Sequence, residues 1–207
     1  MVGNDIIDIN ETRRSSNWER TGFMQKIFTL KEQSIISISN DPFTTVWHLW
    51  SMKESAYKVF IQAGGNRFFN PTKIECSLDS SKNGQVKIDT ITLRTNTSIN
   101  ANFIFSTATI NNPDIDTCIF QLTENNSKQQ SNFIHQQVLN NFAKNNSLNC
   151  AELLIQKTKT GVPTLQYKNK VLDQAFSITH HGKYAAYSIL KSSGNKKQLN
   201  TIKPILL

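Results

Sequence analysis

Hydrophobic and polar residues alternate at the start of the chain and then follow a helical period. The alternation over residues 2–9 predicts a strand, and polar, periodic stretches at 11–20 and 29–36 predict two helices. Three further strands are predicted, at 73–78, 85–94 and 102–110. The first half of the chain therefore mixes helices with strands.

One helix in this half has clear start and stop residues. It begins at Asp41-Pro42, where the aspartate suits the N-cap and the proline the first helical position, and it ends at Gly64-Gly65. Its apolar residues, which include Trp47, Trp50 and Ile61, cover nearly every face. Because a helix that is hydrophobic all round is usually buried, we expect much of this one to lie in the core.

The second half repeats the order of helix and then strands. Residues 123–132 are polar and without pattern, which indicates a boundary, and a helix is predicted at 131–144. Four strands follow, at 151–158, 164–167, 175–179 and 184–190. The tail from Lys191 carries four lysines and no acidic residue and is expected to fray. We therefore predict an α+β fold of two similar small lobes, 1–122 and 123–207, arranged as a pseudo-dimer.

Composition and charge narrow the class of protein. The 207 residues are 38% hydrophobic and 18% charged, which is typical of a folded protein. Lysine and arginine outnumber acidic residues by 23 to 15, which gives a net charge of +8. This excess predicts an anionic partner: a nucleic acid, a phosphorylated small molecule, an anionic membrane or an acidic protein.

The chain contains no feature of a secreted or membrane protein. Its three cysteines, Cys76, Cys118 and Cys150, lack the spacing of a zinc site or a disulfide framework. The N-terminal segment lacks the apolar stretch of a signal peptide, and no window approaches the roughly 20 apolar residues of a membrane span. We therefore expect a cytoplasmic protein that binds no membrane.

Glu54 and Lys58 lie four residues apart in the helix that begins at Asp41, so they stack one turn apart on the same face. An ordinary solvent-exposed pair would have the same spacing and would contribute only about 0.3 kcal/mol. The neighbouring Trp47 and Trp50 favour partial burial, and a partly buried carboxylate needs a paired charge or a metal.

Asp5 and Asp8 lie among apolar residues in the first predicted strand, in the segment GNDIIDI. A strand-terminal aspartate is usually a turn former or a cap. A carboxylate from a strand and one from a helix, here Asp5 and Glu54, would instead suit Mg²⁺, which takes one or two carboxylates and leaves its other positions to water and substrate phosphates. Lys58 would then meet those phosphates.

The segment SITHH at 177–181 puts hydroxyls and imidazoles at the end of a predicted strand, before Gly182. A histidine with a structural partner in a β-turn would give the same pattern. The hydroxyls and the histidine also suit the edge of a phosphate or nucleotide site, because both can donate hydrogen bonds. The turn Gly161-Val162-Pro163 precedes this region.

In their order along the chain, five segments resemble the 4′-phosphopantetheinyl transferase superfamily. They are GNDIIDI (3–9), FTLKE (28–32), WSMKESAYK (50–58), GVP (161–163) and SITHHGKYAA (177–186). The WSMKES..K segment with the upstream GxDI is the most specific part, and the stretch 80–150 matches no motif of the family.

This resemblance implies transfer of the phosphopantetheine arm of coenzyme A (CoA) to a serine of an apo acyl or peptidyl carrier protein, with release of 3′,5′-adenosine bisphosphate. Asp5 and Glu54 would hold Mg²⁺ on the CoA pyrophosphate, and Lys58 would contact the phosphates during transfer. Ser177 and His180 match the S-x-x-H segment that lines the nucleotide and its 3′-phosphate. The base that deprotonates the serine is Glu54 or a metal-bound water.

Other charged residues have less defined roles. Arg13, Arg14 and Arg20 lie in the helical segment predicted after the first strand and are candidates to hold the acidic helix of a carrier protein. The roles of Glu32, which closes FTLKE, and of Asp8 stay open. The motifs also leave open whether the carrier serves fatty-acid or secondary metabolism.

Two features depart from the pattern of the larger family members. These carry GxDxE, whereas this chain has Ile7 at the position of the second acid, as in the short holo-acyl-carrier-protein synthase type. That type is about half this length and builds its site between the subunits of a trimer. We therefore expect one chain to hold two lobes with the site in the cleft between them, and a monomer, with a trimer as the alternative.

Three other functions fit parts of the sequence. One is a different CoA or nucleotide phosphotransferase. A basic nucleic-acid-binding protein would show basic residues clustered with exposed aromatics, whereas the aromatics here cluster around Glu54. A catalytically silent interaction protein would not need Asp5, Glu54 and Lys58. The prediction is a phosphopantetheinyl transferase that binds no nucleic acid.

Overall fold

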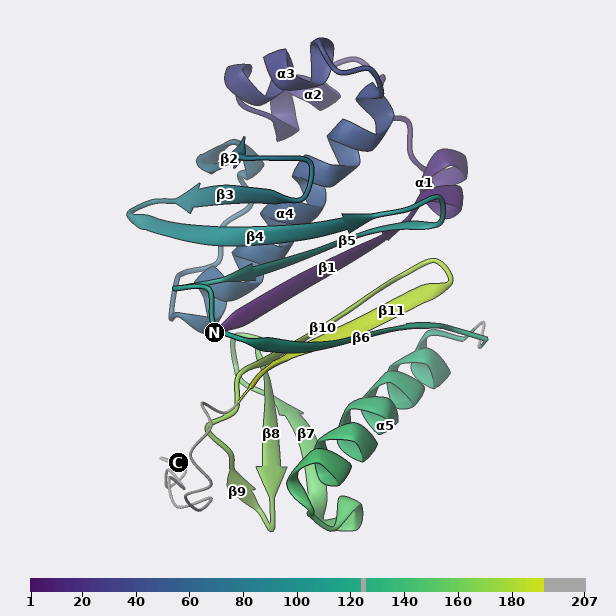
Figure 1. Ribbon diagram of the computed structural model, residues 1–207, viewed down its shortest axis with the longest axis vertical. Coiled ribbons are helices and arrows are strands. Elements are labelled where there is room, and N and C mark those ends of the chain that lie inside the picture. The colour runs from purple at the N-terminus through teal and green to yellow at the C-terminus, as the bar shows by residue number, and fades with distance from the viewer. Residues whose placement is uncertain (124–125, 192–207) are drawn as a thin grey trace.

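The computed structural model describes residues 1–123 and 126–191, which form two stacked α+β units (Figure 1). The first unit contains a five-stranded antiparallel sheet with the order β1-β5-β4-β3-β2. Its strands are β1 (Val2–Asp8), β2 (Ile74–Leu78), β3 (Asn83–Ile88), β4 (Ile91–Ile99) and β5 (Phe103–Thr109). Strand β1 forms the edge of this sheet and faces the second unit (Figure 1).

The long helix α4 (Pro42–Gln62) packs across this sheet, mainly on β1 and β5. The Asp41 carboxylate accepts a hydrogen bond from the Thr44 amide at 3.0 Å, which confirms the predicted N-cap. Leu49 and Met52 are among its fully buried residues. The unit is completed by α1 (Ile9–Ser15), α2 (Phe23–Ile27), α3 (Leu30–Ser37) and the 3-10 turn η1 (Pro71–Lys73).

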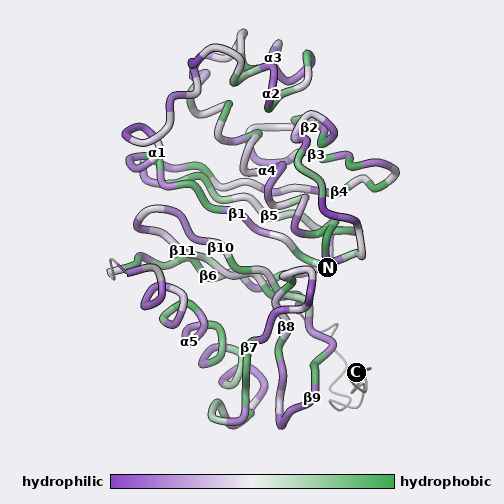
Figure 2. Tube along the Cα trace, turned by 180° about the vertical axis from the view of Figure 1, so that it is seen from behind, coloured by the Kyte–Doolittle hydropathy of each residue, from purple (hydrophilic) through white to green (hydrophobic). Residues whose placement is uncertain are grey.

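The second unit contains two three-stranded sheets and one long helix. The first sheet has the order β10-β11-β6, with β6 (Ile115–Gln121), β10 (Phe176–His181) and β11 (Tyr184–Leu190). The second consists of β7 (Leu153–Lys157), β8 (Pro163–Tyr167) and β9 (Lys170–Val171). Helix α5 (Ser127–Asn146), which precedes η2 (Cys150–Glu152), alternates hydrophobic and hydrophilic positions (Figure 2). Its Val138 and Phe142 pack against strand residues that include Phe176 and Tyr187.

Side chains of the second unit cover the outer edge of β1. Among the described strands, β1 has a hydrogen-bonded neighbour on one side only, and its free amides at Asn4, Ile6 and Asp8 donate to alternate residues of β10. The acceptors are, in the same order, Ser177 Oγ at 3.2 Å, Thr179 Oγ1 at 3.3 Å and His181 Nδ1 at 3.0 Å. Because buried amides need acceptors, this row of hydrogen bonds fixes the two units against each other.

The structure confirms the α+β class and corrects several predicted elements. Residues 85–94 are not one strand, because the chain turns between β3 and β4 at Asp89, where φ is 52°. The helix predicted at 11–20 ends at Ser15, because Ser16 has an extended backbone. Helix α2 was not predicted. No helix in the described part of the chain is long and apolar enough to cross a membrane.

The change from one sheet to the other also differs from the prediction. The predicted first lobe, 1–122, includes residues 115–121, but these form β6 and pair with β11 of the second unit. The change of sheet therefore falls between β5 and β6, ahead of the predicted boundary at 122/123. Of the tail that was predicted to fray from Lys191 onward, residues 192–207 lie outside the described part of the chain.

Candidate active site

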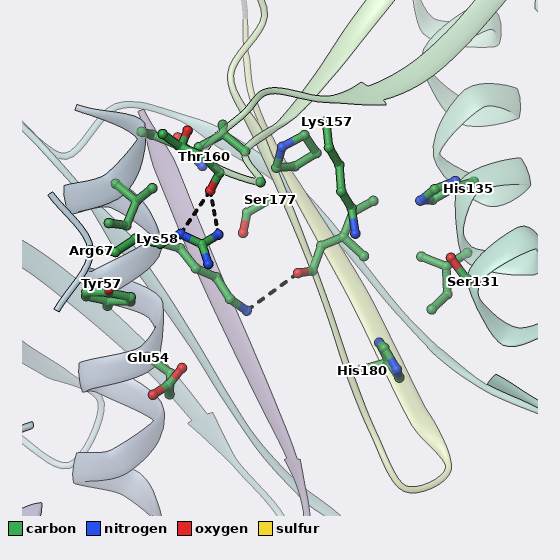
Figure 3. A pocket seen from close by; sticks show the side chains of 17 residues that line it. Glu54, Tyr57, Lys58, Arg67, Ser131, His135, Lys157, Thr160, Ser177 and His180 are labelled. Carbon is green, nitrogen blue, oxygen red and sulfur yellow. Dashed lines mark hydrogen bonds between the residues drawn. The ribbon is translucent and has the colours of Figure 1, made fainter. Parts of the chain in front are cut away.

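A cavity of about 390 Å³ lies between α4 and the second unit (Figure 3). From α4, Glu54 and Lys58 line it, with Tyr57, Ile61 and Gln62 alongside. The second unit contributes His135 of α5, Lys157 of β7, the turn 160–163, and Ser177 and His180 of β10. The cavity thus brings together the segments WSMKESAYK, GVP and SITHH, which are far apart in the sequence.

Lys58 lies between the cavity and Asp5 of β1, which is not itself among the residues that line the cavity. Lys58 Nζ donates to the Asn4 carbonyl at 2.6 Å and lies 3.7 Å from Asp5 Oδ1. It also reaches the Ile178 carbonyl of the second unit at 3.5 Å (Figure 3). The Thr179 hydroxyl donates to Asp5 Oδ1 at 3.2 Å. Asp5 is therefore held where the two units meet.

Asp5 and Glu54 are two carboxylates whose charges repel each other. Burial raises the pKa of Asp5, and the nearby Lys58 ammonium only partly offsets that effect. Burial also raises the pKa of Glu54, and the negative charge of Asp5 raises it further. A cation bound beside both carboxylates would relieve the repulsion and the cost of burial.

The donor set of these two residues fits Mg²⁺. This ion takes oxygen ligands, commonly one or two carboxylates, and keeps several positions for water and substrate phosphates. Within residues 1–123 and 126–191, no group of three or more His, Cys, Asp or Glu side chains is placed to hold a metal. An ion held by Asp5 and Glu54 would have water and oxygens of a phosphorylated substrate as its other ligands.

Ser177 and His180 differ in how they face the cavity. Ser177 is buried, and its Oγ accepts the Asn4 amide hydrogen, which leaves the hydroxyl hydrogen and one acceptor lone pair for other partners. The His180 side chain is exposed, and burial of part of its ring together with the charge of Lys58 lowers its pKa. Its ring can donate a hydrogen bond to a ligand in the cavity. The adjacent His181 instead accepts the Asp8 amide hydrogen.

Three basic residues of the cavity were not predicted: Arg67, His135 and Lys157. Arg67 Nε donates to the Thr160 carbonyl at 3.2 Å, which joins the loop after α4 to the second unit (Figure 3). Gly161 has φ 79°, and a Cβ there would lie 2.5 Å from Arg67 Nη2, so the glycine of GVP makes room for this contact. No spacing in the sequence marks these residues, because only the fold brings them together.

Glu32 and Lys53 form a buried ion pair that supports α4. Lys53 Nζ lies 2.8 Å from Glu32 Oε2, and both side chains are at most 1% exposed. Lys53 also donates to the Pro71 carbonyl at 2.9 Å, and the second oxygen of Glu32 accepts the Cys76 amide hydrogen at 2.7 Å. Glu32 closes the capping box of α3 with Thr29. The role of Glu32 in this structure is therefore to join FTLKE to WSMKES.

Asp8 also has structural partners. Its carboxylate caps α1 by accepting the Glu11 amide hydrogen at 3.0 Å, and it accepts the Lys183 amide hydrogen at 2.9 Å. Gly182 has φ 55°, and a Cβ there would lie 2.4 Å from Asp8 Oδ2. Asp8 therefore ties the turn between β10 and β11 to the first unit.

The three candidate carrier-binding arginines do not share one helix. Arg13 and Arg14 belong to α1, whereas Arg20 follows the end of that helix. Arg13 stacks on the Phe43 ring at 4.0 Å, and Arg14 pairs with Glu11 at 2.6 Å. None of the three lines the cavity between the units.

Glu54, Lys58 and further basic residues line one cavity, and Asp5 lies beside Lys58; such a set of side chains suits a phosphorylated ligand. The family model of the 4′-phosphopantetheinyl transferase superfamily matches residues 1–143, so the chain belongs to this superfamily. The match includes Asp5, Glu54 and Lys58 and ends before Ser177 and His180. No curated protein matches the chain significantly.

Proposed function

We propose that the protein transfers the 4′-phosphopantetheine arm of CoA to a serine of an apo acyl or peptidyl carrier protein, as a holo-acyl-carrier-protein synthase does, in a Mg²⁺-dependent reaction. The observation that carries the proposal is the single cavity in which Glu54 and Lys58 face basic residues of the second unit. CoA has a pyrophosphate and a 3′-phosphate, so it needs cationic partners along its length. Membership of the superfamily supports the type of reaction.

The nucleotide of CoA would occupy the part of the cavity between α4 and β10. Lys58 lies beside Asp5 and would contact the pyrophosphate. Ser177 and His180 would contact the nucleotide and its 3′-phosphate through the Ser177 hydroxyl hydrogen and one ring N–H of His180. Arg67 and Lys157 add positive charge on either side of the turn at Gly161.

Asp5 and Glu54 would hold Mg²⁺, which when bound supplies positive charge at the pyrophosphate. Side chains of the protein would carry out the remaining steps. Either Glu54 or a water beside the ion would take the proton of the attacking serine. Lys58 would stabilise negative charge that develops on the transferred group.

Both sides of the cavity come from one chain, which supports a monomer as the active form. The acidic helix of the carrier protein would contact Arg13, Arg14 and Arg20 at the exposed end of the first unit. We propose that the reaction takes place in the cytoplasm, where CoA and apo carrier proteins would meet the enzyme.

The test is to incubate the protein with CoA, Mg²⁺ and several apo carrier proteins and to measure the mass of each carrier. The proposal predicts that a carrier gains the mass of one phosphopantetheinyl group and that EDTA abolishes the gain. No gain with any carrier, together with tight and salt-sensitive binding of nucleic acid, would contradict it and would favour a basic nucleic-acid-binding protein.

A further inference from the structure

Thr179 of β10 makes two hydrogen bonds to neighbouring residues of β1, beside which β10 lies (Figure 1). Its Oγ1 accepts the Ile6 amide hydrogen at 3.3 Å and donates to Asp5 Oδ1 at 3.2 Å. A hydroxyl has one hydrogen to donate, and in Thr179 the bond to Asp5 uses it. The side chain is 6% exposed and is not among those that line the cavity. The Thr179 hydroxyl therefore acts on Asp5 and not on a ligand in the cavity.

The Asp5 carboxylate needs partners to keep one orientation. The torsion about the Cβ–Cγ bond of an aspartate has broad energy minima, so the backbone alone does not fix where each oxygen points. The Thr179 hydroxyl and the Lys58 ammonium, which lies 3.7 Å away, both approach Oδ1. Ser51 of α4 donates to the backbone carbonyl of Asp5 at 3.3 Å and holds the main chain at this point. With these partners at Oδ1, the second oxygen, Oδ2, is the one that Asp5 would offer to an ion.

The other side chains on this face of β10 have a simpler role at β1. Residues 177, 179 and 181 share the face, because side chains of a strand alternate with a period of two. Ser177 and His181 also accept an amide hydrogen of β1. In the described part of the chain, Thr179 is the member of this row whose side chain also forms a hydrogen bond with the Asp5 carboxylate. A row that requires only acceptors thus has, at one position, a hydroxyl that also donates to a candidate metal ligand.

We propose that Thr179 is a positioning residue, whose hydroxyl holds the Asp5 carboxylate in the orientation that binds Mg²⁺. This inference rests on the proposed function, in which Asp5 and Glu54 hold the ion, and adds a residue that acts through Asp5. Removal of a partner that orients a metal ligand typically weakens metal binding roughly 10- to 100-fold. The alternative is that Thr179 serves the Ile6 amide alone, so that its loss lowers stability and leaves metal affinity unchanged.

The experiment measures binding of Mn²⁺, which stands in for Mg²⁺ and gives an electron paramagnetic resonance signal when it is free in solution. The full chain is titrated with Mn²⁺ in saturating CoA, with CoA alone as the blank, at a temperature where circular dichroism shows the native fold. Thr179→Val should raise the Mn²⁺ Kd roughly tenfold or more. Thr179→Ser keeps the hydroxyl and should bind Mn²⁺ like the wild type. Thr179→Cys has a weaker donor and should give an intermediate Kd, and it serves in place of Thr179→Val if that variant does not fold.

The matched control is Ser188→Ala. Ser188 has a buried hydroxyl at the same junction, which accepts a hydrogen bond from Asn4 Nδ2 at 3.3 Å and lies outside the cavity. Its loss should lower the unfolding free energy and leave the Mn²⁺ Kd unchanged. Transfer kinetics give a second readout: Thr179→Val should raise the KM for Mg²⁺, whereas kcat at saturating Mg²⁺ should stay near the wild-type value, because excess ion fills the weakened site.

A wild-type Mn²⁺ Kd in Thr179→Val would overturn the inference. An equal rise of the Kd in Ser188→Ala would also overturn it, because the effect would then come from the junction as a whole. In both cases the wild-type protein still modifies the carrier, so the proposed function survives. A wild-type protein that binds Mn²⁺ and modifies no carrier would refute the proposed function, and the Kd values would still test the inference. A wild-type protein that binds no Mn²⁺ would refute both the Mg²⁺ dependence and the inference.

Discussion

The buried ion pair between Lys53 and Glu32 offers a sharp test of which motif residues are structural. Lys53 stands directly before Glu54 in WSMKES, so a position in the motif alone would suit a role in phosphate binding. In the structure its ammonium contacts Glu32 and two backbone carbonyls and is 1% exposed. Lys53→Met removes this charge and keeps most of the side-chain volume.

The expected loss of stability arises because Glu32 keeps its buried charge without a partner. Loss of one member of a buried ion pair leaves an uncompensated charge and costs roughly 3–5 kcal/mol of unfolding free energy. For a protein of this size, that loss lowers Tm by roughly 10 °C. Glu32→Gln in the Lys53→Met background removes the unpaired carboxylate, so the double variant should lose less than the two single losses added together.

Urea unfolding followed by circular dichroism measures these free energies. The matched control is Lys31→Met, since Lys31 and Glu75 form an exposed pair at 3.8 Å that should change stability by less than about 0.5 kcal/mol. The reasoning is refuted if Lys53→Met unfolds like the wild type while carrier modification is lost. That result would mean that Lys53 reaches the substrate.

Three further predictions concern the junction, the core and the cavity. Thr179→Val leaves the Ile6 amide without its acceptor and should cost about 1–3 kcal/mol of unfolding free energy. Burial lowers the pKa of His48 to about 4, so the unfolded chain takes up this proton at higher pH than the folded one. Stability should therefore fall between pH 6.5 and 4, by up to about 3 kcal/mol more than in His48→Gln. Lys157→Met should raise the CoA Kd roughly tenfold in titration calorimetry, because it removes a charged partner of a phosphate.

Each of these predictions has a result that contradicts it. Thr92→Val, at an exposed position of β4, should leave the unfolding free energy unchanged. An equal loss of unfolding free energy in Thr92→Val and Thr179→Val would contradict the stabilising role of the hydrogen bond between Thr179 and the Ile6 amide. Parallel acid unfolding curves for His48→Gln and the wild type would show that His48 does not resist protonation. An unchanged CoA Kd in Lys157→Met, as expected for the exposed Lys170→Met, would place the nucleotide elsewhere.

Local sequence patterns were sufficient to predict the elements whose ends are set by residues in or next to the element itself. The helix from Pro42 to Gln62 carries its N-cap and its glycine stop next to its ends, and both predicted ends agree with the structure. The hairpin at Asp89 was missed because its turn contains no glycine or proline, although aspartate tolerates the positive φ. The strand at 115–121 was missed because its place is decided by pairing with β11.

At the site, too, the sequence motifs identified some residues, whereas the positions of others depend on the fold. The motifs identified Glu54 and Lys58, and the structure places both at one cavity. They could not show that Lys53 points inward and Glu54 toward the cavity, since adjacent helical residues differ by about 100° around the axis. Ser177 acts first as an acceptor for the Asn4 amide, a contact between residues 173 positions apart. Arg67 belongs to no motif and reaches the cavity only because the two units meet there.

The most direct test of the account is the rate of phosphopantetheinyl transfer by Glu54→Gln, measured by the mass of an apo carrier with CoA and Mg²⁺ in excess. Glu75→Gln is the matched control, since Glu75 is a half-exposed acid on β2, away from the cavity. The account predicts that Glu54→Gln folds like the wild type and modifies the carrier at least about 100-fold more slowly, while Glu75→Gln keeps the wild-type rate. Transfer by Glu54→Gln at the wild-type rate would contradict it.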